Sequence, residues 1–207
     1  AIAKHGTLFR NCIAPSPMTF PSHATMLTGL HPLQHGVLVN MQAALPQGIQ
    51  TLPERLRDRG WRTGAVVSSS VLHHRFDLDR GFDDYRDDFY SALFDTADPS
   101  LQRTNARTTT REAIEWLKKG TPGQREFLFV HYIDPHSPYN PPSRLAANFP
   151  ESPYLGEVAF VDRQIARLVH FVNQNSKGAN TLWIITSDHG EALGEHGEST
   201  HGFFLYD

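Results

Sequence analysis

Residues 127–142, FLFVHYIDPHSPYNPP, place a strongly apolar run directly before a proline-rich turn. The run at 127–133 is rich in aromatic and β-branched residues, a composition typical of a central β-strand. The turn at 134–142 contains four prolines and several polar side chains. In open parallel sheets, functional residues gather beyond the carboxyl ends of the strands. This turn is therefore one place where a functional site is expected.

Apolar patterning on either side of this stretch alternates between helical and strand periods. Leu52 and Leu56 lie at helical spacing, and Gly60 follows them as a glycine at a helix C-terminus does. The patterns predict helices at 52–59, 109–119 and 157–173 and strands at 62–68 and 182–186. Helices that separate continuous apolar strands indicate an α/β domain whose largely parallel sheet is covered by helices on both faces.

The composition limits the classes of function that fit the chain. Its 207 residues suffice for one domain, and 39% hydrophobic with 20% charged residues are typical of a globular protein. The net charge is -3 and no basic run interleaves with aromatic residues, so no nucleic-acid partner is expected. No apolar run approaches the ~20 residues of a membrane-spanning helix, so no membrane segment is expected in this chain. The single cysteine, Cys12, excludes an internal disulfide.

The stretch at 187–202 follows the last predicted strand and is rich in histidine and acidic residues. Its adjacent Asp188 and His189 offer an oxygen and a nitrogen ligand to a divalent cation. The alternative is a polar loop with surface histidines. The aspartate-rich stretch at 76–88 is predicted to be a solvated loop with a buried aromatic anchor.

Two hydroxyl residues, Thr19 and Ser22, precede a helical pattern that begins at Ala24. A hydroxyl at a helix N-terminus lies where backbone N–H groups and the helix dipole favour an anion. Such a place suits a nucleophile that acts on phosphate or sulfate. The alternative is an ordinary helix cap.

Three segments, taken together and in order, resemble the sulfatase family of the alkaline phosphatase superfamily. They are 19–29 (TFPSHATMLTG), 134–136 (DPH) and 187–202, which contains SDHGE and a final HG. Weaker similarity at 60–64 and 80–85 extends the likeness over nearly the whole chain. The resemblance implies an alkaline phosphatase-like fold with a mixed sheet between helices, here incomplete. It identifies residues 1–207 as a partial sulfatase-type catalytic domain.

The resemblance also implies a nucleophile. By position the nucleophile is Thr19, and the arginine of the family motif is replaced by His23. Sulfatases convert a cysteine or serine at the nucleophile position into formylglycine, and threonine cannot be converted in this way. Superfamily members that cleave phosphate esters and diesters use an unmodified threonine or serine bound to the metal, and Thr-x-Pro-x-His resembles their motif.

The metal site implied by the resemblance contains Asp188 and His189, with the Thr19 oxygen as a further ligand. The cofactor is expected to be a divalent cation: calcium, magnesium, manganese or zinc. Family members carry two acidic ligands after an N-terminal strand, and no Asp or Glu occurs here before Glu54. This chain by itself is therefore expected to bind a cation weakly and to be inactive.

The remaining histidines divide into two groups. His136 and His201 match residues that contact the transferred anion, and together with Thr19 and His23 they are the catalytic candidates. His73 and His74 have no match in the family and are interpreted as surface or packing histidines.

The function implied is metal-dependent hydrolysis of sulfate esters, with a small molecule or a glycan ester as the substrate. Hydrolysis of phosphate mono- or diesters or of phosphonate esters is the alternative, because the nucleophile is a threonine. A noncatalytic protein that binds anions or glycans is a further alternative. A periplasmic or extracellular location is expected from the resemblance alone.

Overall fold

The computed structural model describes residues 2–4, 6–88, 103–175 and 180–202. Its sheet consists of β1 (Arg62–Val66), β2 (Asp84–Arg86) and β3 (Glu126–Val130) in the order β2-β1-β3. Both pairings are parallel, and Gly64 of β1 lies opposite Asp84 on one side and Leu128 on the other. The carboxyl ends of all three strands therefore meet at one edge of the sheet.

Local sequence signals account for where the helices begin. Thr51 and Glu54 form a capping box at α3, and the side chains of Asn105 and Ser152 cap α4 and α6. The helices are α1 (Thr19–Thr28), α2 (Pro32–His35), α3 (Leu52–Arg57), α4 (Ala106–Lys118), α5 (Ser143–Ala146) and α6 (Pro153–Gln174). Short 3-10 turns occur at η1 (Ile2–Lys4), η2 (Ser70–Leu72), η3 (His74–Phe76) and η7 (Glu195–Gly197). Among these described helices, none has both the length and the apolarity that a membrane crossing requires.

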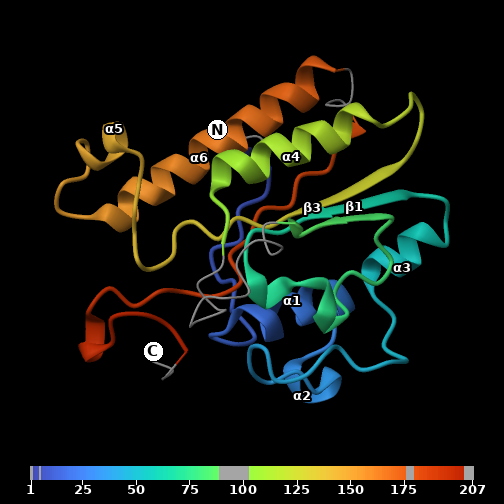
Figure 1. Ribbon diagram of the computed structural model, residues 1–207, viewed down its shortest axis with the longest axis horizontal. Coiled ribbons are helices and arrows are strands. Elements are labelled where there is room, and N and C mark those ends of the chain that lie inside the picture. Colours follow the sequence, from blue (N-terminus) through green and yellow to red (C-terminus); the bar gives the residue numbers. More distant parts are fainter. Residues whose placement is uncertain (1, 5, 89–102, 176–179, 203–207) are drawn as a thin grey trace.

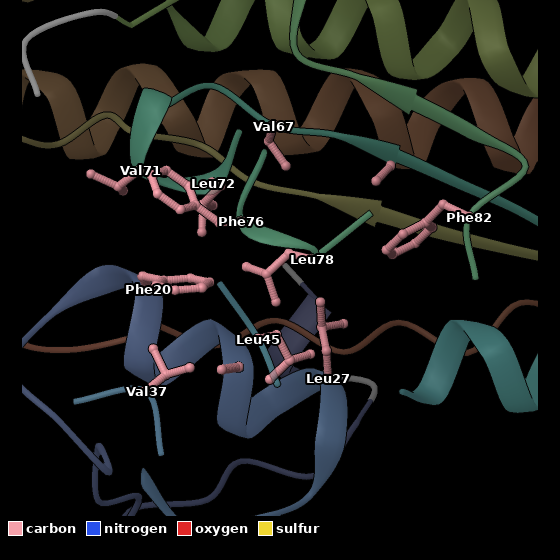
Figure 2. Packing of buried hydrophobic residues seen from close by; sticks show 12 residues of the cluster. Phe20, Leu27, Val37, Leu45, Val67, Val71, Leu72, Phe76, Leu78 and Phe82 are labelled. Carbon is pink, nitrogen blue, oxygen red and sulfur yellow. The ribbon is translucent and has the colours of Figure 1, made fainter. Parts of the chain in front are cut away.

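Helices cover both faces of the sheet, as Figure 1 shows, with α4 and α6 on one side and α1, α2 and α3 on the other. The alternation of side chains along β1 supplies one core on each face, because Ala65 joins the cluster around α1 and Val66 joins the cluster around α4 and α6. Figure 2 shows the first cluster, in which Phe20 and Leu27 of α1 face the sheet. The predicted α/β fold with a parallel sheet is confirmed.

The indole of Trp116 fixes α4 against the sheet. The side chain is fully buried over Gly64, where an added Cβ would overlap the ring. The Arg62 guanidinium lies 3.6 Å from the ring centroid and donates to Glu126 of β3 at 2.7 Å. A glycine is therefore required at position 64, and the ring fixes the position of α4 against β1.

The predicted strand at 182–186 is wrong. This segment has no regular secondary structure and no sheet partner among the described residues, and Leu182 and Ile184 are 83% and 81% exposed. Apolar residues form a strand only where another strand accepts their backbone hydrogen bonds. Within the described residues β3 pairs with β1 alone, and 182–186 pairs with no strand.

Two further predictions are corrected. The stretch at 76–88 is not simply a loop, because β2 lies within it, although its aromatic anchor Phe82 is buried as expected. The helix expected from Ala24 begins five residues earlier, at Thr19. Pro21 is tolerated there because the first turn of a helix lacks partners for its N–H groups.

Candidate active site

Thr19 is the first residue of α1 and lies in the buried interior of the candidate site. The preceding residue, Met18, makes no capping hydrogen bond through its side chain. The Thr19 hydroxyl instead lies 3.3 Å from Nε2 of His189, a residue 170 positions later in the chain. This contact joins the start of α1 to the histidine-rich stretch at 187–202, although the two segments lie far apart in the sequence.

Ser22, the other candidate nucleophile, has a different environment. It is fully buried, and its hydroxyl donates to the backbone oxygen of Ser16 at 2.9 Å. This hydrogen bond holds the chain that enters α1. The geometry therefore distinguishes a hydroxyl directed at histidine, Thr19, from one committed to the backbone, Ser22.

Asp188 lies between two imidazoles. Its Oδ2 is 3.3 Å from Nε2 of His189 and 3.6 Å from Nδ1 of His23. Burial opposes ionisation of Asp188, but the imidazoles of His23, His189 and His131 together lower the pKa of the carboxyl. Burial lowers the pKa of His23, and the Asp188 carboxylate opposes that shift. The carboxylate form of Asp188 is therefore favoured in this corner.

The histidines His136, His189 and His201 lie ring against ring. The centroid of the His201 ring is 4.2 Å from that of His189 and 5.2 Å from that of His136. His201 Nδ1 lies 3.0 Å from the Glu191 carboxylate, and burial lowers the pKa of His201 against the opposing effect of Glu191. The structure thus brings segments 134–136, 187–191 and 201–202 into one cluster.

In four histidines of the site, His23, His136, His189 and His201, the Nδ1 atom faces an oxygen. In each ring Nδ1 faces an oxygen that can only accept a hydrogen bond, so Nδ1 is the donor. These acceptors are the backbone oxygens of Thr19, Ser137 and Gly190 for His23, His136 and His189, and the Glu191 carboxylate for His201. When neutral, these rings leave the Nε2 lone pair free for a metal or a proton, and when protonated they present an Nε2–H to an anion.

The turn that carries His136 is held in place by Glu157 of α6. The Glu157 side chain is buried, and its two oxygens accept from the backbone N–H groups of His136 at 3.1 Å and Asn140 at 2.7 Å. Arg103 donates to the carbonyl oxygens of residues 136–138. Burial raises the pKa of Glu157, and these two N–H groups oppose the shift. In the sequence, a glutamate on the apolar face of the helix predicted at 157–173 is the signal that could have singled out Glu157.

His131 is a site residue that the sequence patterns missed. It follows β3, is buried, and packs edge-on against the His23 ring at 4.9 Å between centroids. Its Nδ1 lies 3.2 Å from the Ser68 hydroxyl, and burial lowers the pKa of His131 to about 3. A histidine inside an apolar strand was the available signal. His131 is therefore a neutral polar group in the wall of the site.

The donor atoms around His189 fit a divalent cation. Asp188 Oδ2 and Thr19 Oγ1 each lie 3.3 Å from His189 Nε2, so one carboxylate, one hydroxyl and one imidazole converge. Oxygen and nitrogen donors of this kind suit zinc, manganese or magnesium. A single carboxylate offsets only part of a divalent charge, so these residues form part of a ligand set.

Comparisons with known proteins identify the family of the chain. The sulfatase family model matches residues 1–204. The chain is 24% identical over 234 residues to N-acetylgalactosamine-6-sulfatase of Canis lupus familiaris, which covers 93% of this chain and 45% of that protein. It is 23% identical over 232 residues to the ulvan-active sulfatase of Formosa agariphila, covering 94% and 45%.

Solved structures share the fold. The putative sulfatase yidJ of Bacteroides fragilis superposes with a TM-score of 0.77 at 20% identity, covering 96% of this chain and 57% of that one. The phosphonate monoester hydrolase of Agrobacterium radiobacter does so with a TM-score of 0.67 at 17% identity, covering 93% and 57%. The chain spans about 45% of the length of the two curated relatives named above. With its sequence matched almost from end to end and its fold shared, the chain belongs to the sulfatase family.

Proposed function

We propose that this chain carries the nucleophile and part of the metal site of a sulfatase-type ester hydrolase, with Thr19 as the attacking residue. The contact between Thr19 Oγ1 and His189 Nε2 at 3.3 Å carries the proposal. It places a buried hydroxyl at a helix N-terminus beside the residues that match the metal ligands of the family. The hydroxyl of Ser22 is held by its hydrogen bond to the backbone oxygen of Ser16, which supports Thr19 rather than Ser22 as the nucleophile.

The chemistry is displacement at sulfur or phosphorus. A bond forms from Thr19 Oγ1 to the central atom while the bond to the leaving oxygen breaks, and water later hydrolyses the threonine ester. Thr19 gives its hydroxyl proton to solvent as it attacks, because the His189 Nε2 that faces the hydroxyl would be occupied as a ligand of the cation. A divalent cation held by Asp188 and His189 would supply positive charge that lowers the pKa of the hydroxyl and neutralises ester oxygens.

His136 and His201 act on the oxygens of the reacting group. Because Nδ1 of each ring faces an acceptor, a protonated ring offers Nε2–H to a nonbridging or departing oxygen. Burial lowers the pKa of His201, so this residue gives up its proton readily. It is the candidate acid for the leaving oxygen.

Sulfated glycans are the proposed substrate class. The names of two relatives, N-acetylgalactosamine-6-sulfatase and ulvan-active sulfatase, support this choice. Phosphate or phosphonate ester hydrolysis is the second candidate, and the unmodified threonine favours it, since Thr19 cannot become formylglycine. The connected cluster of polar groups argues against a noncatalytic anion-binding protein.

The test compares ester classes and two hydroxyl variants in an active preparation that contains residues 1–207. Nitrophenyl sulfate, phosphate, phosphate diester and phosphonate ester are each supplied with zinc, manganese, magnesium or calcium. Thr19→Ala should lower kcat by ~10³-fold or more. Ser22→Ala is the matched control and should keep most of kcat. Loss in Ser22→Ala with near-normal Thr19→Ala would show that the nucleophile is misassigned.

A further inference from the structure

A second cluster of ligating side chains contains none of the residues of the candidate active site. It contains His73, His74 and Asp87, whose ligand atoms all lie within 4.8 Å of one another. Oδ2 of Asp87 is 2.9 Å from Nδ1 of His74 and 3.8 Å from Nε2 of His73. Two imidazole nitrogens thus face a single carboxylate oxygen.

The fold builds this cluster from two neighbouring strands. β1 and β2 are parallel, so the residues that follow them emerge at the same edge of the sheet. The chain after β1 turns through η2 into η3, which begins at His74, while Asp87 directly follows β2. The two histidine rings lie against each other, with their centroids 3.9 Å apart and their planes tilted by 35°.

The Asp87 carboxylate is buried, and the side chains that can compensate its charge are imidazoles. Asp87 is 5% exposed, and it also accepts from the backbone N–H of His74 at 2.8 Å. In the portion of the chain that the structure describes, its ion-pair partners are His73 and His74. A buried carboxylate requires a compensating charge.

We propose that His73, His74 and Asp87 form a second metal site, selective for Zn²⁺ and other cations that prefer imidazole together with carboxylate. Two nitrogens and one oxygen are the donor set of many zinc sites, with a fourth position left for water. The His74 side chain is 58% exposed, which gives an ion access from solvent. The site is independent of the proposed hydrolase function.

Binding at this site has a local consequence at His73. Its Nδ1 now accepts from the backbone N–H of Arg75 at 3.1 Å, so a neutral ring carries its proton on Nε2. Coordination through Nε2 moves that proton to Nδ1 and breaks the bond to Arg75. An ion here would also tie η3 to the end of β2. The amide resonance of Arg75 is therefore a reporter of binding at His73.

The experiment titrates the untagged chain with Co²⁺, followed by its visible absorption, and then displaces the Co²⁺ with Zn²⁺. The expected result for His74→Ala is a dissociation constant raised roughly 100-fold or more, since loss of even an outer partner of a ligand costs 10–100-fold. Zn²⁺ should raise the unfolding temperature of the wild-type chain and should shift the Arg75 amide resonance. Neither effect should occur in His74→Ala.

Two controls separate this site from other histidines and from the hydrolase site. His170→Ala removes an exposed histidine of α6 and should bind as the wild type does. Asp188→Asn disables the candidate active site and should keep the Co²⁺ spectrum. Circular dichroism and a second variant, His74→Gln, control for misfolding. Unchanged affinity in both His74 variants, or loss of binding in Asp188→Asn, would overturn the proposal.

Discussion

His131→Asn should reduce the acid sensitivity of the fold. Burial lowers the pKa of His131 to about 3, whereas an unfolded histidine has a pKa of about 6.5. As pH falls below 6.5 the unfolded chain takes up a proton that the folded chain refuses. The stability linked to His131 is therefore complete above pH 6.5 and is lost as pH falls toward 3.

The two pKa values set the size of the effect. Between pH 7 and pH 5 they correspond to a loss of about 2 kcal/mol in the free energy of unfolding. Asparagine keeps an acceptor near the position of Nδ1, where the Ser68 hydroxyl lies at 3.2 Å, but it cannot be protonated. The smaller volume of asparagine changes the free energy of unfolding by a similar amount at both pH values. The difference between the two pH values therefore isolates the contribution of protonation.

Urea unfolding of the chain at pH 7 and pH 5 measures this difference. The wild type should lose about 2 kcal/mol more than His131→Asn over this interval. His170→Asn, a change at an exposed histidine, should retain the wild-type pH dependence. If His131→Asn also retained it, the assignment of His131 as a buried neutral group would be refuted.

Three further changes test the surroundings of the site. Glu157→Gln leaves one of two backbone N–H groups without its acceptor and should cost about 1–3 kcal/mol in urea unfolding; an unchanged midpoint would show that the turn at 134–140 is held by other contacts. His201→Ala should slow hydrolysis of esters with poor leaving groups more than nitrophenyl esters, and equal losses across a leaving-group series would instead assign His201 to the metal or to anion binding. Calorimetry of residues 1–207 with Mg²⁺ or Ca²⁺ should detect no submicromolar site, because the candidate corner supplies one carboxylate; tight binding that Asp188→Asn abolishes would contradict this.

The α/β class followed from the sequence because apolar runs and helical stripes report burial directly. The helix predicted at 157–173 is α6, although its start at Pro153 needed the Ser152 cap to locate it. The strand predicted at 182–186 failed because apolarity does not reveal whether a partner strand lies alongside. β2 escaped prediction because only three residues pair, and aspartate stands at its first position.

Within the site, the sequence could identify candidate residues but not which residues surround them. The motifs that match the sulfatase family pointed to Thr19, Asp188 and His189, and the structure places these three within one set of contacts. His131 and Glu157 depend on neighbours far along the chain, and no local pattern encodes such contacts. The resemblance assigned the nucleophile to Thr19 by position, and the hydrogen bond of Ser22 to Ser16 supports that choice, which stays a prediction.

If Thr19 is the attacking residue, it becomes covalently esterified during turnover. Rapid acid quenching of an active preparation with saturating substrate, followed by peptide mass spectrometry, detects such an ester. We expect a sulfuryl or phosphoryl group on Thr19 that appears within one turnover, disappears when substrate is exhausted, and is absent from Thr19→Ala. The same group on Ser22, or full turnover by Thr19→Ala, would contradict it.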